Sequence, residues 1–326
     1  MEQLDDLEQV QCRCLKARAE HSIGFVPTMG YLHQGHLSLI RQARADCEMV
    51  VVSIFVNPLQ FGAGEDFGQY PRTLDRDREL LTARGCDLLF APAVETLYPN
   101  GLETQTQVHV PDVSEGLCGG TRIGHFDGVA TVVSLLLHLV QPDIACFGEK
   151  DFQQLAVIRK LVADLHFPIE IVGVPTVRAE DGLALSSRNG YLSSSDRALA
   201  PVFYRTLSRC GDALARGQSP AAALAEAGQA LQEAGFRLDY LELRAPSLAP
   251  FDAARHDEGR LLGAVYLGRD TIRSLAVSTD TDFDRLDEMY KEFLNVQDEA
   301  LPHLSQAGSI RNLALGRSAV TDRGLR

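Results

Sequence analysis

Two histidines, His33 and His36, lie three residues apart in the segment PTMGYLHQGH at residues 27–36. The segment separates an apolar run from an amphipathic one, which is typical of a strand that turns into a helix. Side chains at positions i and i+3 of a helix face the same side. Two imidazole donors in the first helical turn could therefore stabilise the charge that builds on one phosphate, each donor being worth roughly 3–4 kcal/mol. The pattern indicates a nucleotide site, and a helix cap with surface histidines is the alternative.

The backbone of the same segment suits an anion. The first turn of a helix offers unpaired N–H groups and the positive end of the helix dipole, which attract phosphate. Gly30 and Gly35 let the backbone approach a ligand where a Cβ atom would intrude. The chain carries neither a Walker A lysine motif nor a GxGxxG fingerprint, and GAGEDFG at residues 62–68 lacks the helix pattern that either would need. The histidine segment is thus the candidate for binding a nucleotide.

Short apolar runs alternate with helical patterns over the first half of the chain, which predicts an α/β fold with a parallel sheet covered on both faces. Ligands of such a sheet bind at the carboxyl ends of its strands, and residues 27–36 follow the first expected strand. The expected strands are residues 22–26, 49–55, 87–90, 144–147 and 169–174, and the expected helices begin near Gly35, span 73–85 and 128–140, and follow Asp151.

The pattern changes after Pro175. VRAEDGLALSSRN at residues 177–189 predicts a turn or short hairpin at Asp181-Gly182, and a smaller α+β domain is expected beyond it. From Ser278 the chain becomes polar. Helices are expected at 194–215, 219–234 and 283–296 and strands at 238–244 and 260–268, which gives domains at 1–176 and 177–277 followed by a polar extension at 278–326.

Composition narrows the class of protein. The chain has 326 residues, enough for two domains, and a formal net charge of −13, which argues against a nucleic-acid partner. No apolar run reaches the roughly 18 residues of a membrane span, and the acidic N-terminus does not match a signal peptide. Seven scattered cysteines predict reduced thiols rather than disulfides. We therefore expect a cytoplasmic protein, which must gather positive groups locally if its substrates are anions.

Three further stretches extend the pattern, namely FVNPLQF at 55–61, FGEKDFQQL at 147–155 and VRAEDGLALSSRN at 177–189. With PTMGYLHQGH they occur in the order and approximate spacing of the pantoate–β-alanine ligase family, which the chain resembles from about residue 21 to about residue 268. The resemblance implies a Rossmann-like nucleotidyltransferase domain with a smaller C-terminal lid domain. It also implies a homodimer that uses ATP and Mg²⁺ to join pantoate to β-alanine through a pantoyl adenylate, releasing AMP and pyrophosphate.

The resemblance also implies roles for individual residues. His36 matches the family's catalytic histidine, and His33, Lys150 and Arg188 are expected to act on the same phosphates. A carboxylate nucleophile needs no base, so the catalytic burden lies on stabilising the phosphate and the departing pyrophosphate. The residues expected to bind ATP are Met29, Gly30, Tyr31, Leu32, Gln34, Gly35, Gly148, Glu149, Asp151, Val177, Leu185, Ser186 and Ser187.

Three amide side chains are the expected pantoate ligands. Gln60 and Gln154 match the two family glutamines that hold pantoate, and Asn57 is a further candidate that could instead shape the turn before Pro58. Neutral amides can hydrogen-bond the hydroxyl groups and the carboxylate of pantoate without a cation that would quench the nucleophile. Asp77 corresponds to an acidic position near the family's magnesium, with a helix-surface aspartate as the alternative.

The chain departs from the family pattern at a few positions. Cys118 stands where the family commonly has glutamate, Ile123 where it commonly has proline, and DTIRSLAV at 270–277 replaces a different closing strand. These departures leave open a paralogous AMP-forming amide ligase that uses a related hydroxy acid or a different amine. Two further alternatives are nucleotidyl transfer to a phosphorylated substrate, against which the two glutamines weigh, and a non-catalytic protein that kept the fold.

Overall fold

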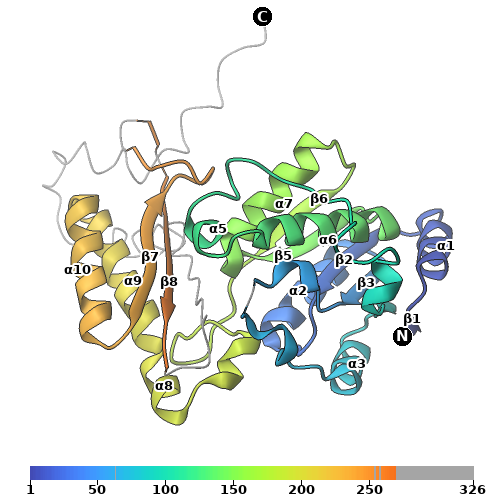
Figure 1. Cartoon of the computed structure of the whole chain (residues 1–326), viewed down its shortest axis with the longest axis horizontal. Helices are drawn as coiled ribbons and strands as arrows, with labels where there is room; N and C mark the ends of the chain where they lie inside the picture. Colours follow the sequence, from blue (N-terminus) through green and yellow to red (C-terminus); the bar gives the residue numbers. More distant parts are fainter. Residues whose placement is uncertain (63, 253–254, 257, 269–326) are drawn as a thin grey trace, which may run out of the picture.

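The computed structural model describes residues 1–62, 64–252, 255–256 and 258–268. Its first part is a six-stranded sheet with the strand order β1-β4-β3-β2-β5-β6, in which every paired strand is parallel to its neighbour (Figure 1). The five expected strands are confirmed. The sheet consists of β1 (Glu2–Leu4), β2 (Ile23–Thr28), β3 (Met49–Ile54), β4 (Leu88–Phe90), β5 (Ile144–Gly148) and β6 (Glu170–Val174).

Helices cover both faces of this sheet (Figure 1). Successive strand residues point to opposite faces, so Phe25 packs into the apolar cluster with α1, α6 and α7, whereas Val26 packs into the cluster with α2. Both faces of the sheet are therefore buried, as the continuous apolar strands predict. The helices of this part are α1 (Leu7–Arg18), α2 (Gln34–Asp46), α3 (Leu74–Ala83), α4 (Val94–Leu97), α5 (Leu117–Thr121), α6 (His125–Val140) and α7 (Phe152–Asp164).

The second part has its own apolar core, which includes Phe203, Leu207 and Val265. It pairs an antiparallel sheet of β7 (Arg237–Arg244) and β8 (Arg260–Tyr266) with α8 (Ser194–Leu199), α9 (Pro201–Ala215) and α10 (Pro220–Glu233). The single helix expected at 194–215 is in fact two helices. Pro201 begins α9 because proline, which lacks an N–H group, fits the first turn of a helix and not its interior.

Short 3₁₀ turns and a hairpin connect these elements near the carboxyl ends of the strands. The turns are η1 (Pro58–Gln60), η2 (Asp66–Gly68), η3 (Glu149–Asp151) and η4 (Ser187–Tyr191). The hairpin expected at Asp181-Gly182 is present, since the Ala179 N–H donates to the Leu183 carbonyl at 2.8 Å and Gly182 has φ +92°. The connections thus project toward the face where the histidine segment lies.

The ends of the chain differ from the expectations or lie outside the described residues. The short edge strand β1 and helix α1 were not expected from the sequence. The helix at 283–296, the altered segment at 270–277 and the extension at 278–326 lie outside the described residues, and the domain boundary at residue 176 stays a prediction. None of the helices in the described part of the chain combines the length and the apolar character that crossing a bilayer requires.

Candidate active site

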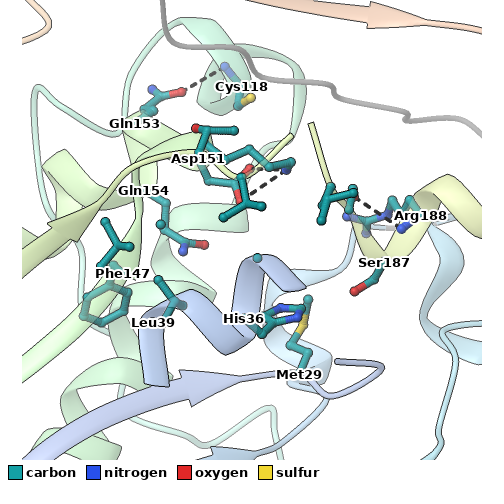
Figure 2. Close-up of a pocket in the computed structure, with 18 of the residues that line it drawn as sticks. Met29, His36, Leu39, Cys118, Phe147, Asp151, Gln153, Gln154, Ser187 and Arg188 are labelled. Atoms are coloured by element: carbon teal, nitrogen blue, oxygen red, sulfur yellow. Dashed lines mark hydrogen bonds and ion pairs between the residues drawn. The ribbon is translucent and has the colours of Figure 1, made fainter. Parts of the chain in front are cut away.

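A cleft opens where the carboxyl ends of β2 and β5 meet the segment that leads into η4 (Figure 2). Many of the residues singled out in the sequence line it. They are Met29, His33, Gly35, His36, Gln60, Gly148, Lys150, Asp151, Gln154, Val177, Leu185, Ser186, Ser187 and Arg188. Seven others do not line it, namely Gly30, Tyr31, Leu32, Gln34, Asn57, Asp77 and Glu149.

The two histidines form a reciprocal cap at the start of α2. His33 Nδ1 accepts a hydrogen bond from the Gly35 N–H at 3.1 Å, and His36 Nδ1 accepts one from the His33 N–H at 3.3 Å. The two rings lie 4.0 Å apart between centroids. The histidines therefore cap a helix and also line the cleft, and their contact with a nucleotide stays a prediction.

Burial keeps both rings neutral, and the cap decides which nitrogen carries the proton. Burial, followed by repulsion from Lys150, lowers the pKa of His33 to about 4. Burial, followed by repulsion from His33 and Lys150, lowers the pKa of His36 to about 3. The rings are therefore neutral near pH 7. Because each Nδ1 is an acceptor, the hydrogen-bond network assigns the single proton of each ring to Nε2. The site thus carries two neutral N–H donors.

Glycine is required at Gly35 by the cap itself. A Cβ atom there would lie 2.9 Å from the His33 ring, which sits against the Gly35 backbone because it accepts from that N–H group. Gly30 has φ +82°, and Tyr31 follows with φ +51°. Two consecutive left-handed residues make a sharp turn that side chains resist, so the turn needs outside support.

Asp77 supplies that support, and its expected place near a magnesium ion stays a prediction. It is 1% exposed, and its two carboxylate oxygens accept from the Tyr31 and Leu32 N–H groups, each at 2.8 Å. The Thr73 hydroxyl adds a third bond at 3.2 Å. Asp77 therefore holds the turn before His33 in place, and it offers no oxygen to the cleft.

Gln60 reaches the cleft from η1, and Asn57 positions it. The Asn57 amide nitrogen donates to Gln60 Oε1 at 3.2 Å and to the Gly128 carbonyl at 3.0 Å, and Asn57 Oδ1 accepts from the Tyr98 hydroxyl at 2.8 Å. Asn57 is 1% exposed and does not line the cleft, which matches the alternative that it shapes the turn before Pro58. It shapes the turn that presents Gln60.

The backbone of helix α6 lies directly against the turn η1. A Cβ atom on Gly128 would lie 2.3 Å from the Leu59 carbonyl oxygen and 2.6 Å from the Gln60 nitrogen. The backbone of α6 therefore packs directly on the backbone of η1. No larger residue fits at Gly128 without moving Gln60.

The consecutive glutamines Gln153 and Gln154 have different surroundings. Gln153 is buried and binds the turn before α5, accepting from the Cys118 N–H at 2.9 Å and donating to carbonyls that include that of Gly116 at 3.1 Å. Figure 2 shows Gln154 pointing into the cleft near Leu39. Within the described part of the chain, the Gln154 amide has no hydrogen-bond partner, so it is available to a ligand.

Each cation that lines the cleft is paired with an acid. Lys150 Nζ lies 3.1 Å from Asp151 Oδ1. Arg188 donates two parallel bonds to Asp66, at 3.0 Å from Nε and 2.9 Å from Nη2. The third cation, Arg122, was not singled out in the sequence, and it pairs with Glu65 at 2.6 Å. The segment at residues 62–68 therefore carries two carboxylates that contact the site, which its glycine pattern did not reveal.

Arg122 also binds a third ring. It donates to His125 Nε2 at 2.9 Å, and His125 Nδ1 donates to the Gln60 carbonyl at 2.8 Å. Burial, followed by repulsion from Arg122, lowers the pKa of His125 to about 4. His125 therefore carries its proton on Nδ1, the opposite tautomer to His33 and His36, and it ties the backbone of Gln60 to Arg122.

Cys118 joins the two parts of the molecule across the cleft. Its thiol lies 3.2 Å from the hydroxyl of Tyr240 on β7, and the nearby Thr121 hydroxyl donates to Asp239 at 3.2 Å. Burial raises the pKa of the Cys118 thiol, which therefore stays protonated. In this chain a neutral hydrogen-bonded pair occupies the wall where the resemblance leads one to expect a carboxylate.

Comparison with known proteins decides the family. A family model described as pantoate-beta-alanine ligase matches residues 2–274. The chain belongs to the pantoate–β-alanine ligase family. It is 60% identical to the pantothenate synthetase of Chromohalobacter salexigens over 278 residues, which cover 84% of this chain and 98% of that protein. It is 57% identical to the pantothenate synthetase of Pseudomonas aeruginosa, over 82% of this chain and 95% of that protein.

Solved structures of the family agree with the fold. The crystal structure of pantothenate synthetase from Thermus thermophilus has a TM-score of 0.75 and 48% identity, over 83% of this chain and 99% of that chain. The pantoate–β-alanine ligase of Francisella tularensis, complexed with beta-gamma ATP and beta-alanine, has a TM-score of 0.70 and 33% identity, over 86% of this chain and 96% of that chain. The α/β fold expected from the sequence is confirmed.

Proposed function

We propose that this chain is an AMP-forming ligase that condenses pantoate with β-alanine to give pantothenate, through a pantoyl adenylate. One observation carries the proposal. A single cleft in the described part of the chain is lined by two neutral imidazoles and three cations, and also by the amides of Gln60 and Gln154. The first group suits a triphosphate and the second suits a hydroxy acid with a free carboxylate.

The donor geometry supports the first step. Pantoate attacks the α-phosphate of ATP through its carboxylate, which is already ionised and needs no general base. Charge grows on the phosphate oxygens in the transition state, and the Nε2–H groups of His33 and His36 are preorganised donors for it because the helix cap holds both rings. Lys150, Arg188, Ser186 and Ser187 are assigned to the departing pyrophosphate.

The amides support substrate choice. Gln60 is fixed by Asn57, and its Nε2 group lies 3.0 Å from the Met29 sulfur, a weak acceptor that a carboxylate or hydroxyl oxygen would readily replace. Gln154 has its whole amide facing the cleft. The β-alanine amine then attacks the carbonyl carbon of the adenylate, forming the amide bond and releasing AMP. The two amides hold the acyl group for both steps.

The described residues do not form a resident magnesium site. No group of three or more histidine, cysteine, aspartate or glutamate side chains in the described ranges is placed to hold a metal, and both Asp77 oxygens are bonded to backbone. We keep Mg²⁺ in the proposal only as the ion that accompanies ATP, where phosphates and water are its usual ligands. The homodimer, which rests on the resemblance, and the cytoplasmic location, which rests on the composition, also stay parts of the proposal.

The paralogous ligase considered above is not favoured. Relatives with 60% and 57% identity over most of the chain are named pantothenate synthetases. Cys118, which replaces the family's glutamate, was one reason to consider that alternative. Its thiol has a local hydrogen-bond partner in the Tyr240 hydroxyl. This substitution leaves Gln60 and Gln154, the amides assigned to the acid, in the cleft.

Product identification tests the proposal. The purified chain is incubated with ATP, Mg²⁺, pantoate and β-alanine, and mass spectrometry follows pantothenate and AMP. Pantoate-dependent exchange of pyrophosphate into ATP measures the first step alone. We expect both products in equal amounts, and exchange that requires pantoate but not β-alanine. Exchange with pantoate combined with amide formation only from another amine would overturn the assignment of the second substrate.

A further inference from the structure

Two consecutive acids in one loop neutralise two arginines of the cleft. Asp66 pairs with Arg188, and Glu65 pairs with Arg122. Since Lys150 pairs with Asp151, every cation that lines the cleft in the described part of the chain has a carboxylate partner. The cleft of this acidic chain therefore holds little uncompensated positive charge for an incoming triphosphate.

The Asp66–Arg188 pair has the geometry of a ligand contact. Two parallel N–H···O bonds of 3.0 and 2.9 Å join the guanidinium to the carboxylate, and a phosphate group binds arginine through the same fork. The side chains of Arg188 and Asp66 are 20% and 18% exposed, so the pair is largely shielded from water. Asp66 occupies the edge formed by Nε and Nη2, so a phosphate that binds this edge must displace the carboxylate.

Other contacts tie the position of this loop to η4. The Tyr191 hydroxyl donates to the Gln69 carbonyl at 3.3 Å, and the guanidinium of Arg188 lies 5.9 Å from the centre of the Tyr70 ring. Within the loop, Phe67 packs edge-on against Phe61 with ring centroids 5.3 Å apart. Displacement of the Asp66 carboxylate would therefore change the environment of Phe67.

We propose that Asp66 occupies on Arg188 the place that the β- and γ-phosphates of ATP take, and that ATP binding exchanges one anion for the other. Asp66 is then a positioning residue: it holds the guanidinium at the cleft while no nucleotide is bound, and it moves away with residues 64–68 when the triphosphate arrives. The inference rests on the proposed function, because it requires ATP at this cleft. AMP, which lacks the β- and γ-phosphates, does not drive the exchange.

A single tryptophan reports the exchange. The chain contains no tryptophan, so Phe67→Trp introduces one fluorophore beside Asp66. We expect its emission to shift when Mg·ATP is added without pantoate, and to shift with inorganic tripolyphosphate, but to stay unchanged with AMP. If the emission of a variant that still makes pantothenate does not shift with ATP or with tripolyphosphate, the exchange is overturned and the proposed function is left intact.

Removing the charge of Asp66 provides a second test. The exchange predicts tighter binding of ATP, whereas a purely structural role of Asp66 does not. Asp66→Asn frees the guanidinium of Arg188 from competition, so we expect ATP to bind about tenfold more tightly in equilibrium titration, with AMP affinity unchanged. If Asp66 only stabilised the loop, the substitution would weaken ATP binding or leave it unaltered, and either result would overturn the proposal.

A matched control exists in the same part of the molecule. Asp181 forms an ion pair with Arg197 at 2.6 Å, and neither residue lines the cleft. Asp181→Asn removes the same charge and breaks a single, more exposed ion pair, so its ATP affinity should equal that of the unmodified chain. Tighter ATP binding in both variants would show a general effect of net charge and would also count against the exchange. Absence of pantothenate formation by the unmodified chain would instead refute the proposed function.

Discussion

His36 accepts a hydrogen bond from the backbone N–H of His33 through its ring nitrogen Nδ1, at 3.3 Å. The same bond, which caps the start of α2, therefore decides which nitrogen of His36 carries the proton. A structural requirement of α2 and a chemical requirement of adenylation are satisfied by one tautomer. Substitutions that retain only one of the two functions can separate them.

His36→Asn places an amide oxygen near the position of Nδ1 but loses the donor at Nε2, whereas His36→Gln extends an amide nitrogen toward the position of Nε2. We expect Asn and Ala variants to lower pantoate-dependent pyrophosphate exchange at least about a hundredfold, and Gln to recover part of that loss. Urea unfolding midpoints provide the control for the cap. Equal rates in the Asn variant and the unmodified chain would remove His36 from catalysis.

Asp77 provides a test of structure against metal binding. Asp77→Asn replaces one acceptor with an NH₂ group that faces a backbone N–H, so we expect the free energy of unfolding to fall by about 1–3 kcal/mol. The Mg²⁺ concentration needed for half-maximal exchange should not change. An unchanged stability together with a raised Mg²⁺ requirement would instead favour a metal ligand.

Gln153 and Gln154 form a natural pair of test and control. Gln153→Ala leaves the Cys118 N–H without its acceptor, so it should lower the free energy of unfolding by about 1–3 kcal/mol. Gln154→Ala should raise the KM for pantoate at least about tenfold with an unchanged unfolding midpoint, since its amide bonds no described residue. The reverse assignment of the two effects would contradict the orientation shown in Figure 2.

The neutral histidines give a pH dependence of stability. The pKa values of His33, His36 and His125 in the folded chain are about 4, 3 and 4, below the ordinary value of 6.5. As the pH falls from 6.5 toward 4, the unfolded chain binds protons at these rings and the folded chain does not, so the free energy of unfolding falls. Each ring contributes a slope of up to about 1.4 kcal/mol per pH unit.

His125→Gln isolates one of these contributions. Its amide can still donate to the Gln60 carbonyl, but it does not titrate. Urea unfolding of both chains at about pH 7, 6 and 5 should show a shallower loss of stability in the variant, by about 1 kcal/mol per pH unit at most. Parallel lines for the two chains would show that His125 is protonated in the folded state.

Most of the sheet could be predicted because its strands are apolar on both faces and alternate with helices. Strand β1 could not, since three residues at an edge carry no periodicity and depend on pairing with β4. The break between α8 and α9 lies inside an alanine-rich helical pattern, which hides it in the sequence. Pro201 marks the break because proline prefers the first turn of a helix.

The candidate site likewise contains residues that the sequence could predict and residues that it could not. His33, His36, Gln60, Gln154 and Arg188 are marked by side-chain chemistry and by resemblance, and they line one cleft. Asn57 and Asp77 have the same chemistry, but their burial and backbone contacts make them supports, which spacing alone cannot reveal. Glu65 and Asp66 act on arginines that lie far away in the chain, so no local pattern could connect them.

The contact of Gly128 with η1 has a consequence for anyone who wishes to redesign the range of acids. Because main chain meets main chain there, no larger residue can replace Gly128 without moving the turn that presents Gln60. The part of the cleft where Leu39 and Phe147 stand beside Gln154 is lined by side chains, and both residues belong to buried apolar clusters. Libraries aimed at bulkier or smaller analogues should therefore leave Gly128 unchanged, and variants at Leu39 and Phe147 should be screened for stability as well as for activity.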